Sequence, residues 1–249
     1  MGIISPVVFA NSYSAVIETN PDALDIAAAS DAERKAGIIR GPLHGIPFLV
    51  KDNIGSKDKM QTTAGSMAYC LSLFQLTYSL IGSILPADST VVARLRKAGA
   101  ILLGKANLSE FADARTGSYS EGFSARGGQT RPPYNLSQEP GGSSSGPAVA
   151  VTANMVPFAL GTETDGSVIS PADRNSVVGF KPTVGLTSRT GVIPESHRQD
   201  SVGTFGKTVK DAVYALDGCF GPDPADNYSL AQIGKTPASI SFSMSPLIS

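Results

Sequence analysis

The sequence predicts an α/β fold in which helices cover a layered sheet, and three observations support this prediction. Residues 44–50 and 100–103 are short apolar runs of strand length, and the amphipathic segment 89–98 lies between them, so strand, helix and strand alternate. The chain has 249 residues, an ordinary length for one α/β domain. Only 16% of the residues are charged, so we expect much of the chain to be buried, in its own core or by another surface. We therefore predict one domain over residues 1–249, with a core over about residues 12–235 and an unstructured tail over residues 236–249.

Composition argues against several classes of function. The net charge is −1 and no block of basic or acidic residues occurs, which gives no support to nucleic-acid binding or to electrostatic membrane docking. Two cysteines far apart and two histidines provide neither a disulfide framework nor a metal-binding spacing. No stretch reaches the ~18 apolar residues of a membrane span, and the N-terminus makes a poor signal peptide. We expect a cytoplasmic protein, although Asn-x-Ser sequons at Asn107, Asn135 and Asn227 leave secretion open.

The first half of the chain predicts two helices and two strands. A helix is expected over residues 11–36, with a cap at Asn20-Pro21-Asp22, and a strand over residues 44–50 that ends at Lys51. Residues 56–66 have the composition of a loop. Residues 69–79 match neither neighbour and are interpreted as a strand or an insertion. The helix over residues 89–98 has Ser89-Thr90 as its cap, and the strand over residues 100–103 follows it.

The second half begins with an irregular segment, residues 115–140, of the kind that is often functional in a compact domain. Two glycine-flanked serine clusters follow, at residues 141–146 and 161–167. Between them we expect a helix that runs from about residue 147 to residue 154 and a strand over residues 156–160. The remainder predicts a strand over residues 177–180, a loop-rich stretch over residues 184–206 and a helix over residues 207–220.

The serine clusters contain the candidate nucleophiles, Ser143 and Ser167. Neither His44 nor His197 lies in a sequence context that suits a partner base, and no Gly-x-Ser-x-Gly elbow surrounds either serine. A lysine can activate a serine only when it is neutral, which requires a dry site. Lys51 at the end of a buried strand fits that need best, and Lys105, which also follows a buried strand, is its competitor.

Plainer interpretations exist for each of these residues. The serine clusters also fit turns that cap helices, Ser144 fits a cap for the helix near Pro147, and Lys51 fits a surface lysine at a strand end. A glycine-rich loop before a helix also suggests phosphate binding, but the Walker pattern is absent. Residues 129–131 fit either a pocket lining or a polar loop.

Four motifs in order resemble the amidase signature family. They are HGIPFLVKDN at residues 44–53, PGGSSSG at residues 140–146, GTETDGS at residues 161–167 and GFKPT at residues 179–183. The resemblance covers roughly residues 12–235 and includes the spacing of 24 residues between Ser143 and Ser167. It implies a mixed, twisted β-sheet flanked by helices, which we expect to be incomplete in this chain.

The resemblance also implies a Ser–cis-Ser–Lys triad that cleaves carboxylic amides by acyl transfer. Ser167 is then the nucleophile, Ser143 the bridging serine in a non-proline cis peptide, and Lys51 the base. The backbone N–H groups of Thr164, Asp165, Gly166 and Ser167 form the implied oxyanion hole, and Gly141, Gly142 and Ser144 support the site. The expected substrate is a small linear amide, no metal or other cofactor is expected, and a homodimer is left open.

Three departures from the usual family pattern accompany this resemblance. Glu163 replaces an aspartate, Asp165 replaces a glycine, and Ile169 stands where an arginine is usual. Family members are also usually far longer, so we expect a fragment or an incorrectly joined gene product. The alternative function is accordingly a catalytically incompetent fragment, or a partner-binding subunit of an amidotransferase-type assembly.

Overall fold

The computed structural model describes residues 12–67, 85–114, 118 and 120–240. In this part of the chain, a six-stranded sheet has the order β1-β3-β2-β6-β8-β7 and a two-stranded hairpin pairs β4 with β5. The strands are β1 (Val16–Thr19), β2 (Pro47–Lys51), β3 (Ile101–Ala106), β4 (Phe123–Ser124), β5 (Gly128–Gln129), β6 (Phe158–Glu163), β7 (Val178–Phe180) and β8 (Ser201–Gly206). The helices are α2 (Ala23–Lys35), α4 (Thr90–Lys97), α5 (Ser145–Thr152), α6 (Ile169–Arg174) and α7 (Val209–Asp217), with 3₁₀ turns η2 (Glu110–Asp113) and η3 (Asn227–Gln232).

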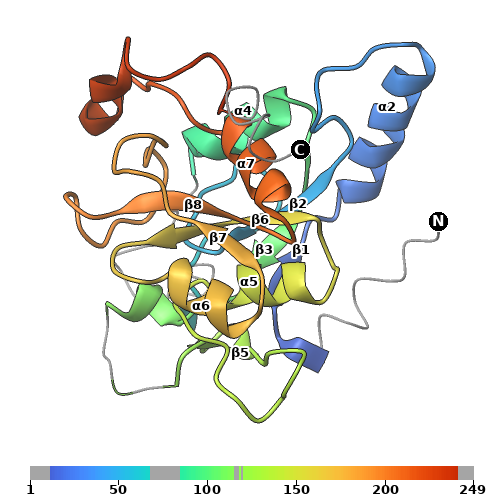
Figure 1. Ribbon diagram of the computed structural model, residues 1–249. Helices are drawn as coiled ribbons and strands as arrows, with labels where there is room; N and C mark the ends of the chain where they lie inside the picture. Colours follow the sequence, from blue (N-terminus) through green and yellow to red (C-terminus); the bar gives the residue numbers. More distant parts are fainter. Residues whose placement is uncertain (1–11, 68–84, 115–117, 119, 241–249) are drawn as a thin grey trace.

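The sheet is mixed, and helices cover both of its faces (Figure 1). Strand β2 runs parallel to both β3 and β6, whereas β1–β3, β6–β8 and β7–β8 are antiparallel pairs. Helices α5 and α6 pack on one face, and α4 and α7 lie on the opposite face. The predicted α/β fold with a mixed, helix-flanked sheet is therefore confirmed.

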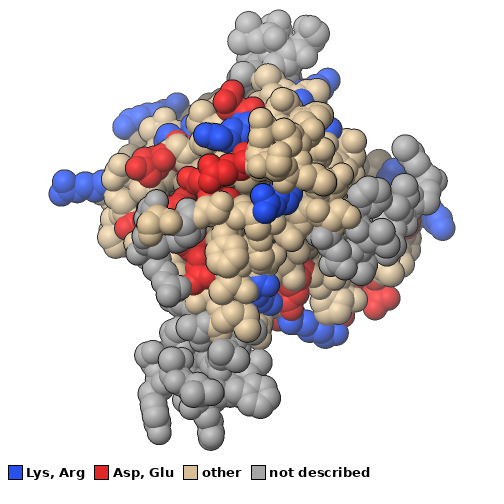
Figure 2. All heavy atoms as spheres, turned by 90° about the horizontal axis from the view of Figure 1, so that it is seen from below, with Lys and Arg blue, Asp and Glu red and all other residues tan. Residues whose placement is uncertain are grey.

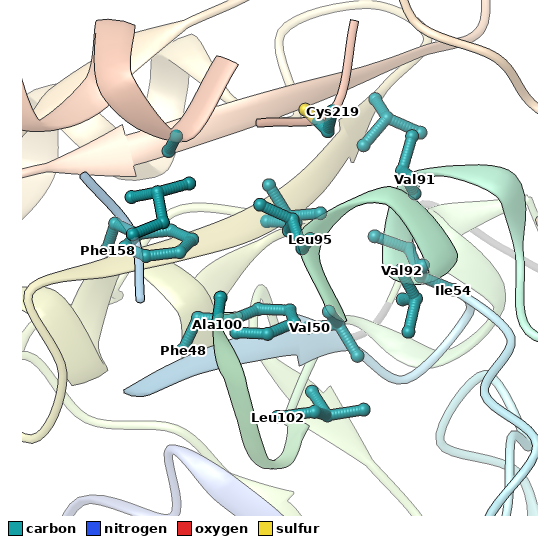
Figure 3. Packing of buried hydrophobic residues seen from close by; sticks show 14 of the residues in the cluster. Phe48, Val50, Ile54, Val91, Val92, Leu95, Ala100, Leu102, Phe158 and Cys219 are labelled. Atoms are coloured by element: carbon teal, nitrogen blue, oxygen red, sulfur yellow. The ribbon is translucent and has the colours of Figure 1, made fainter. Parts of the chain in front are cut away.

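Each face of the sheet has its own apolar core. On the α4 side, Phe48 of β2 and Phe158 of β6 stack with ring centroids 5.4 Å apart, and Leu95 of α4 packs over them (Figure 3). On the α5 side, every residue of α5 is buried, with Leu49 and Phe205 in the same cluster. Burial on all sides explains why the segment between the two serine clusters carries no charge.

The helix expected over residues 11–36 is wrong in its first half, because Val16–Thr19 form the edge strand β1. Asn20 separates the two elements. Its side-chain amide donates to the carbonyl of Leu102 in β3, and its Oδ1 accepts from the N–H of Asp22. The tertiary contact with β3 thus fixes the chain as a strand before the helix begins at Ala23.

The loop expected over residues 184–206 contains the central strand β8, which the sequence pattern concealed. All six residues of β8 are buried, with Val202 in one core cluster and Phe205 in the other. A strand that is buried on both faces lacks the polar and apolar alternation that marks a half-buried strand. Strand β6 likewise continues beyond the predicted residue 160 to Glu163.

The other predicted elements agree more closely with the structure. The helices expected over residues 89–98 and 207–220 are α4 and α7, and the strands expected over residues 44–50, 100–103 and 177–180 correspond to β2, β3 and β7. The expected Ser89 cap does not bond through its side chain, whereas Thr208 of α7 forms a capping box with Asp211. The irregular segment over residues 115–140 contains the hairpin β4–β5. The segment 69–79, interpreted as a strand or an insertion, and residues 241–249 lie outside the described residues.

The described surface carries mixed charges. On the face in Figure 2, acidic and basic side chains are interspersed over largely uncharged surface, so no stripe of one sign covers that face. Within the described part of the chain, no helix is both long and apolar enough to cross a bilayer.

Candidate active site

Lys51 is the last residue of β2, and its ammonium group lies inside the protein. The side chain is fully buried, and Nζ donates to Ser143 Oγ at 2.7 Å and to Thr162 Oγ1 at 2.9 Å. Ser143 Oγ in turn donates to Ser167 Oγ at 3.0 Å. Three residues from separate segments of the chain therefore form one hydrogen-bonded series that begins at Lys51 and ends at Ser167.

Burial determines the protonation of Lys51. It lowers the pKa of this side chain to about 8, and the negative charges of Asp113, Glu195 and Asp200 oppose the shift. An ordinary lysine has a pKa of 10.5, so Lys51 is neutral in a far larger fraction of molecules near neutral pH than an exposed lysine is. The neutral amine can accept a proton from a hydroxyl.

The segment before α5 places Ser143 by close backbone packing. The Gly142–Ser143 peptide bond is cis. A Cβ atom on Gly142 would overlap the carboxylate of Glu121 and the hydroxyl of Ser109, so only glycine fits at this position. The backbone of Gly142 therefore runs directly against these two side chains.

Ser144 joins the two serine clusters, and its interpretation as a helix cap is wrong. Although it is the N-cap residue of α5, its side chain bonds to no helix N–H. Its Oγ instead donates to the carbonyl of Thr162 at 2.9 Å and accepts from the N–H of Thr162 at 3.2 Å. Its own N–H donates to the carbonyl of Ser167. Ser144 thus fixes the end of β6 and the turn at Ser167 relative to Ser143.

The turn that carries Ser167 lies between β6 and α6, and Glu163 stabilises it. Glu163 Oε2 accepts from the N–H of Val168 at 2.7 Å and from that of Ile169 at 2.9 Å. Gly166 adopts a φ of +90°, a conformation that favours glycine. Among the described residues, no hydrogen-bond acceptor is found for the N–H groups of Asp165, Gly166 and Ser167.

The competing bases do not reach the serines. Lys105 is also buried, and burial likewise lowers its pKa to about 8, but its Nζ donates to the carbonyl of Ile54 and to Thr62 Oγ1. His44 Nδ1 accepts from the N–H of Arg40 on another part of the surface. Within the described residues, no group of His, Cys, Asp or Glu has the arrangement of a metal site.

Residues 129–131 serve the loop rather than the site. Gln129 donates to the carbonyl of Glu121, Thr130 is buried against Asn107, and the N–H of Arg131 donates to the carbonyl of Tyr13. The polar-loop interpretation of this stretch is therefore the better one.

A cavity of about 210 Å³ adjoins the lysine end of the hydrogen-bonded series. Asn53 and Thr162 line it, and both are tied to Lys51, because Asn53 Nδ2 donates to the Thr162 hydroxyl that accepts from Lys51. The rest of the lining is Thr164, Arg189, Thr190, Val192, Ile193, Pro194, Glu195, His197, Asp200, Ser201, Val202, Ala225 and Asp226. Sequence reasoning missed these residues, although Asn53 and Thr162 lie inside the motifs that it identified.

Residues 8–243 match the family described as Amidase, and because this match spans most of the chain, the protein belongs to the amidase family. Membership supports amide hydrolysis as its chemistry. A Schizosaccharomyces pombe relative whose name classes it as an amidase is 60% identical over 228 residues, which are 91% of this chain and 37% of the relative. A glutamyl-tRNA(Gln) amidotransferase subunit of Symbiobacterium thermophilum is 43% identical over 220 residues, 88% of this chain and 41% of that relative.

Among solved structures, the native peptide amidase of Stenotrophomonas maltophilia superimposes with a TM-score of 0.84 and 47% identity. The superposition covers 96% of this chain and 46% of the peptide amidase. The chain therefore spans about two fifths of the length of these curated relatives and about half of this enzyme.

Proposed function

We propose that the protein hydrolyses the C–N bond of small linear carboxylic amides, with Ser167 as nucleophile, Ser143 as proton relay and Lys51 as general base. The observation that carries this proposal is the hydrogen-bonded series from Lys51 Nζ through Ser143 Oγ to Ser167 Oγ, with distances of 2.7 and 3.0 Å. These lengths are within the range for direct proton transfer between neighbouring groups.

The reaction begins when neutral Lys51 accepts the proton of Ser143 Oγ, which accepts the proton of Ser167 Oγ. The Ser167 oxygen attacks the carbonyl carbon and forms a tetrahedral oxyanion. As that intermediate collapses, the C–N bond breaks and the same relay returns the proton to the leaving amine. Water then attacks the acyl-enzyme ester, releases the acid and restores Ser167.

The oxyanion requires donors that are free in the resting protein. We assign this role to the backbone N–H groups of Thr164, Asp165, Gly166 and Ser167. The N–H groups of the last three lack acceptors among the described residues, which supports the assignment. Loss of one such donor typically costs ~10²–10³ in rate. Gly141, Gly142 and Ser144 keep the relay serine beside this turn.

A second candidate is the release of ammonia from glutamine for transfer to a partner. It is favoured by the 43% identity to a protein named as a glutamyl-tRNA(Gln) amidotransferase subunit. Both candidates use the same acyl transfer, so they differ in the amide that is accepted. Comparing ammonia release from glutamine with that from uncharged primary carboxamides distinguishes them.

A fluorophosphonate probe, which reacts with activated serines, tests the proposal. The folded full chain should be labelled, Ser167→Ala should abolish labelling, and Ser170→Ala, a matched change one helical turn away, should retain it. The proposal fails if folded protein is not labelled or if Ser167→Ala is labelled as well as the parent. In that case the chain is a catalytically incompetent member of its family.

A further inference from the structure

The cavity beside Lys51 contains a buried acceptor that nothing in the described part of the protein satisfies. Asn53 is 3% exposed and lines the cavity. Its Nδ2 donates to Thr162 Oγ1 at 3.0 Å, but its Oδ1 has no hydrogen-bond partner among the described residues. An unsatisfied buried carbonyl oxygen is costly, and a ligand that presents an N–H donor would remove that cost.

Two carboxylates on the same cavity wall compete for one proton. Thr164 Oγ1 lies 2.9 Å from Glu195 Oε2 and 2.6 Å from Asp200 Oδ1. A threonine hydroxyl has a single proton to donate, so one of these oxygens lacks that donor whenever both carboxylates are ionised. A cation in the cavity would offset their mutual repulsion.

The remaining charges of the lining leave this negative character in place. Arg189 forms a two-pronged ion pair with Asp226, at 2.9 Å through Nε and 2.6 Å through Nη2, so each neutralises the other. Glu195 and Asp200 keep a net negative charge within the lining. The apolar side chains of Val192, Ile193 and Val202 complete a wall suited to a short hydrocarbon.

We infer that this cavity is a subsite for an alkylammonium group, with Asn53 Oδ1 as hydrogen-bond acceptor and Glu195 and Asp200 as the counter-charges. The inference rests on the proposed amidase function in one respect, since it assigns to the substrate a cationic amine outside the amide that is cleaved. The cavity shares Thr162 with Lys51, and the side chain of Thr164 belongs to the turn assigned as the oxyanion hole. A substrate held there would thus lie beside the reacting groups.

The test measures binding in the Ser167→Ala full chain at pH 7, by ligand-observed NMR titration. The probes are n-butylammonium, 1-butanol and butyrate, which have similar chains and differ in charge. We expect butylammonium to bind at least roughly tenfold more tightly than the other two, because hydrogen bonds to charged groups are the stronger ones. Added salt should weaken butylammonium binding.

Variants then locate the bound ion. Asn53→Leu should weaken butylammonium binding about tenfold through loss of the buried acceptor. Glu195→Gln, on an exposed side chain, should weaken it about threefold. Glu139→Gln, a matched exposed glutamate outside the cavity lining, should leave it unchanged. If Asn53→Leu fails to fold, Glu195→Gln and Glu139→Gln still provide the comparison.

The inference is overturned if butylammonium does not bind, if butanol or butyrate binds equally well, or if Glu195→Gln binds like Glu139→Gln. These results are separate from the fate of the proposed function. Serine labelling is scored on the parent chain, whereas binding is scored on a variant that cannot form an acyl-enzyme.

Discussion

Lys51 Nζ lies 2.7 Å from Ser143 Oγ, although 92 residues separate the two in the sequence. Strand β2 ends at Lys51 inside the sheet, and the neighbouring strand β6 leads to the turn that carries Ser167. Because parallel strands end at the same edge of the sheet, β2 and β6 deliver the proposed base and the proposed nucleophile to one place.

Two buried lysines with the same lowered pKa provide a matched pair of variants. Lys51→Met should reduce the labelling rate of folded protein by roughly 10²–10⁴-fold, the usual contribution of a general base. Lys105→Met should reduce the melting temperature, because the Ile54 carbonyl loses its donor, but should leave the labelling rate of the folded fraction unchanged. Equal loss of labelling in both variants would contradict the assignment of Lys51 as the base.

The rate of serine acylation should rise with pH, with a midpoint near 8. Burial lowers the pKa of Lys51 to about 8, so the neutral base predominates above that pH and is lost as the pH falls through it. Stopped-flow labelling across pH 6 to 10 measures the midpoint, within about two units of the expected value. Glu195→Gln should move the midpoint to lower pH, since the charge of Glu195 raises the pKa of Lys51. A profile that rises only near 10.5, the ordinary lysine value, would show that Lys51 is not the titrating group.

Glu163 should act as a positioning residue for the Ser167 turn. Glu163→Ala leaves the N–H groups of Val168 and Ile169 without their acceptor, which should destabilise the protein by about 1.5–3 kcal/mol and lower the labelling rate. Glu163→Gln retains an acceptor oxygen and should recover most of both losses. Chemical denaturation and labelling kinetics measure the two effects, and an alanine variant with parental labelling would argue against this role.

The stacked pair of Phe48 and Phe158 should dominate the stability of the α4-side core. Phe48 is fully buried, so Phe48→Ala should lower the free energy of unfolding by about 3–5 kcal/mol. Phe123 is 42% exposed, and Phe123→Ala should change that free energy by less than about 0.5 kcal/mol. Urea denaturation of both variants provides the comparison, and similar losses would mean that the core is assigned wrongly.

Local patterns predicted the helices better than the strands. The amphipathic spacing in residues 89–98 and 207–220 led directly to α4 and α7, since one face of each packs on the sheet. Strand β8 was missed because it is buried on both faces and so shows no alternation. Strand β1 was taken for helix because its pairing with β3 outweighs local propensity.

The sequence by itself determined the membership of the amidase family, the α/β class and the identity of the three residues proposed for the relay. It could do so because glycine-flanked serines and a strand-end lysine occur in a fixed order and spacing. Only the tertiary structure decided that Lys51, and not Lys105, contacts the serines, that Ser144 ties β6 to the turn at Ser167, and that Asn53 leaves an acceptor in a cavity. Both lysines follow the same local pattern of a buried strand end, so no local signal separates them. Their hydrogen-bond partners depend on which strands become neighbours in the sheet, and residues far apart in the chain determine that order.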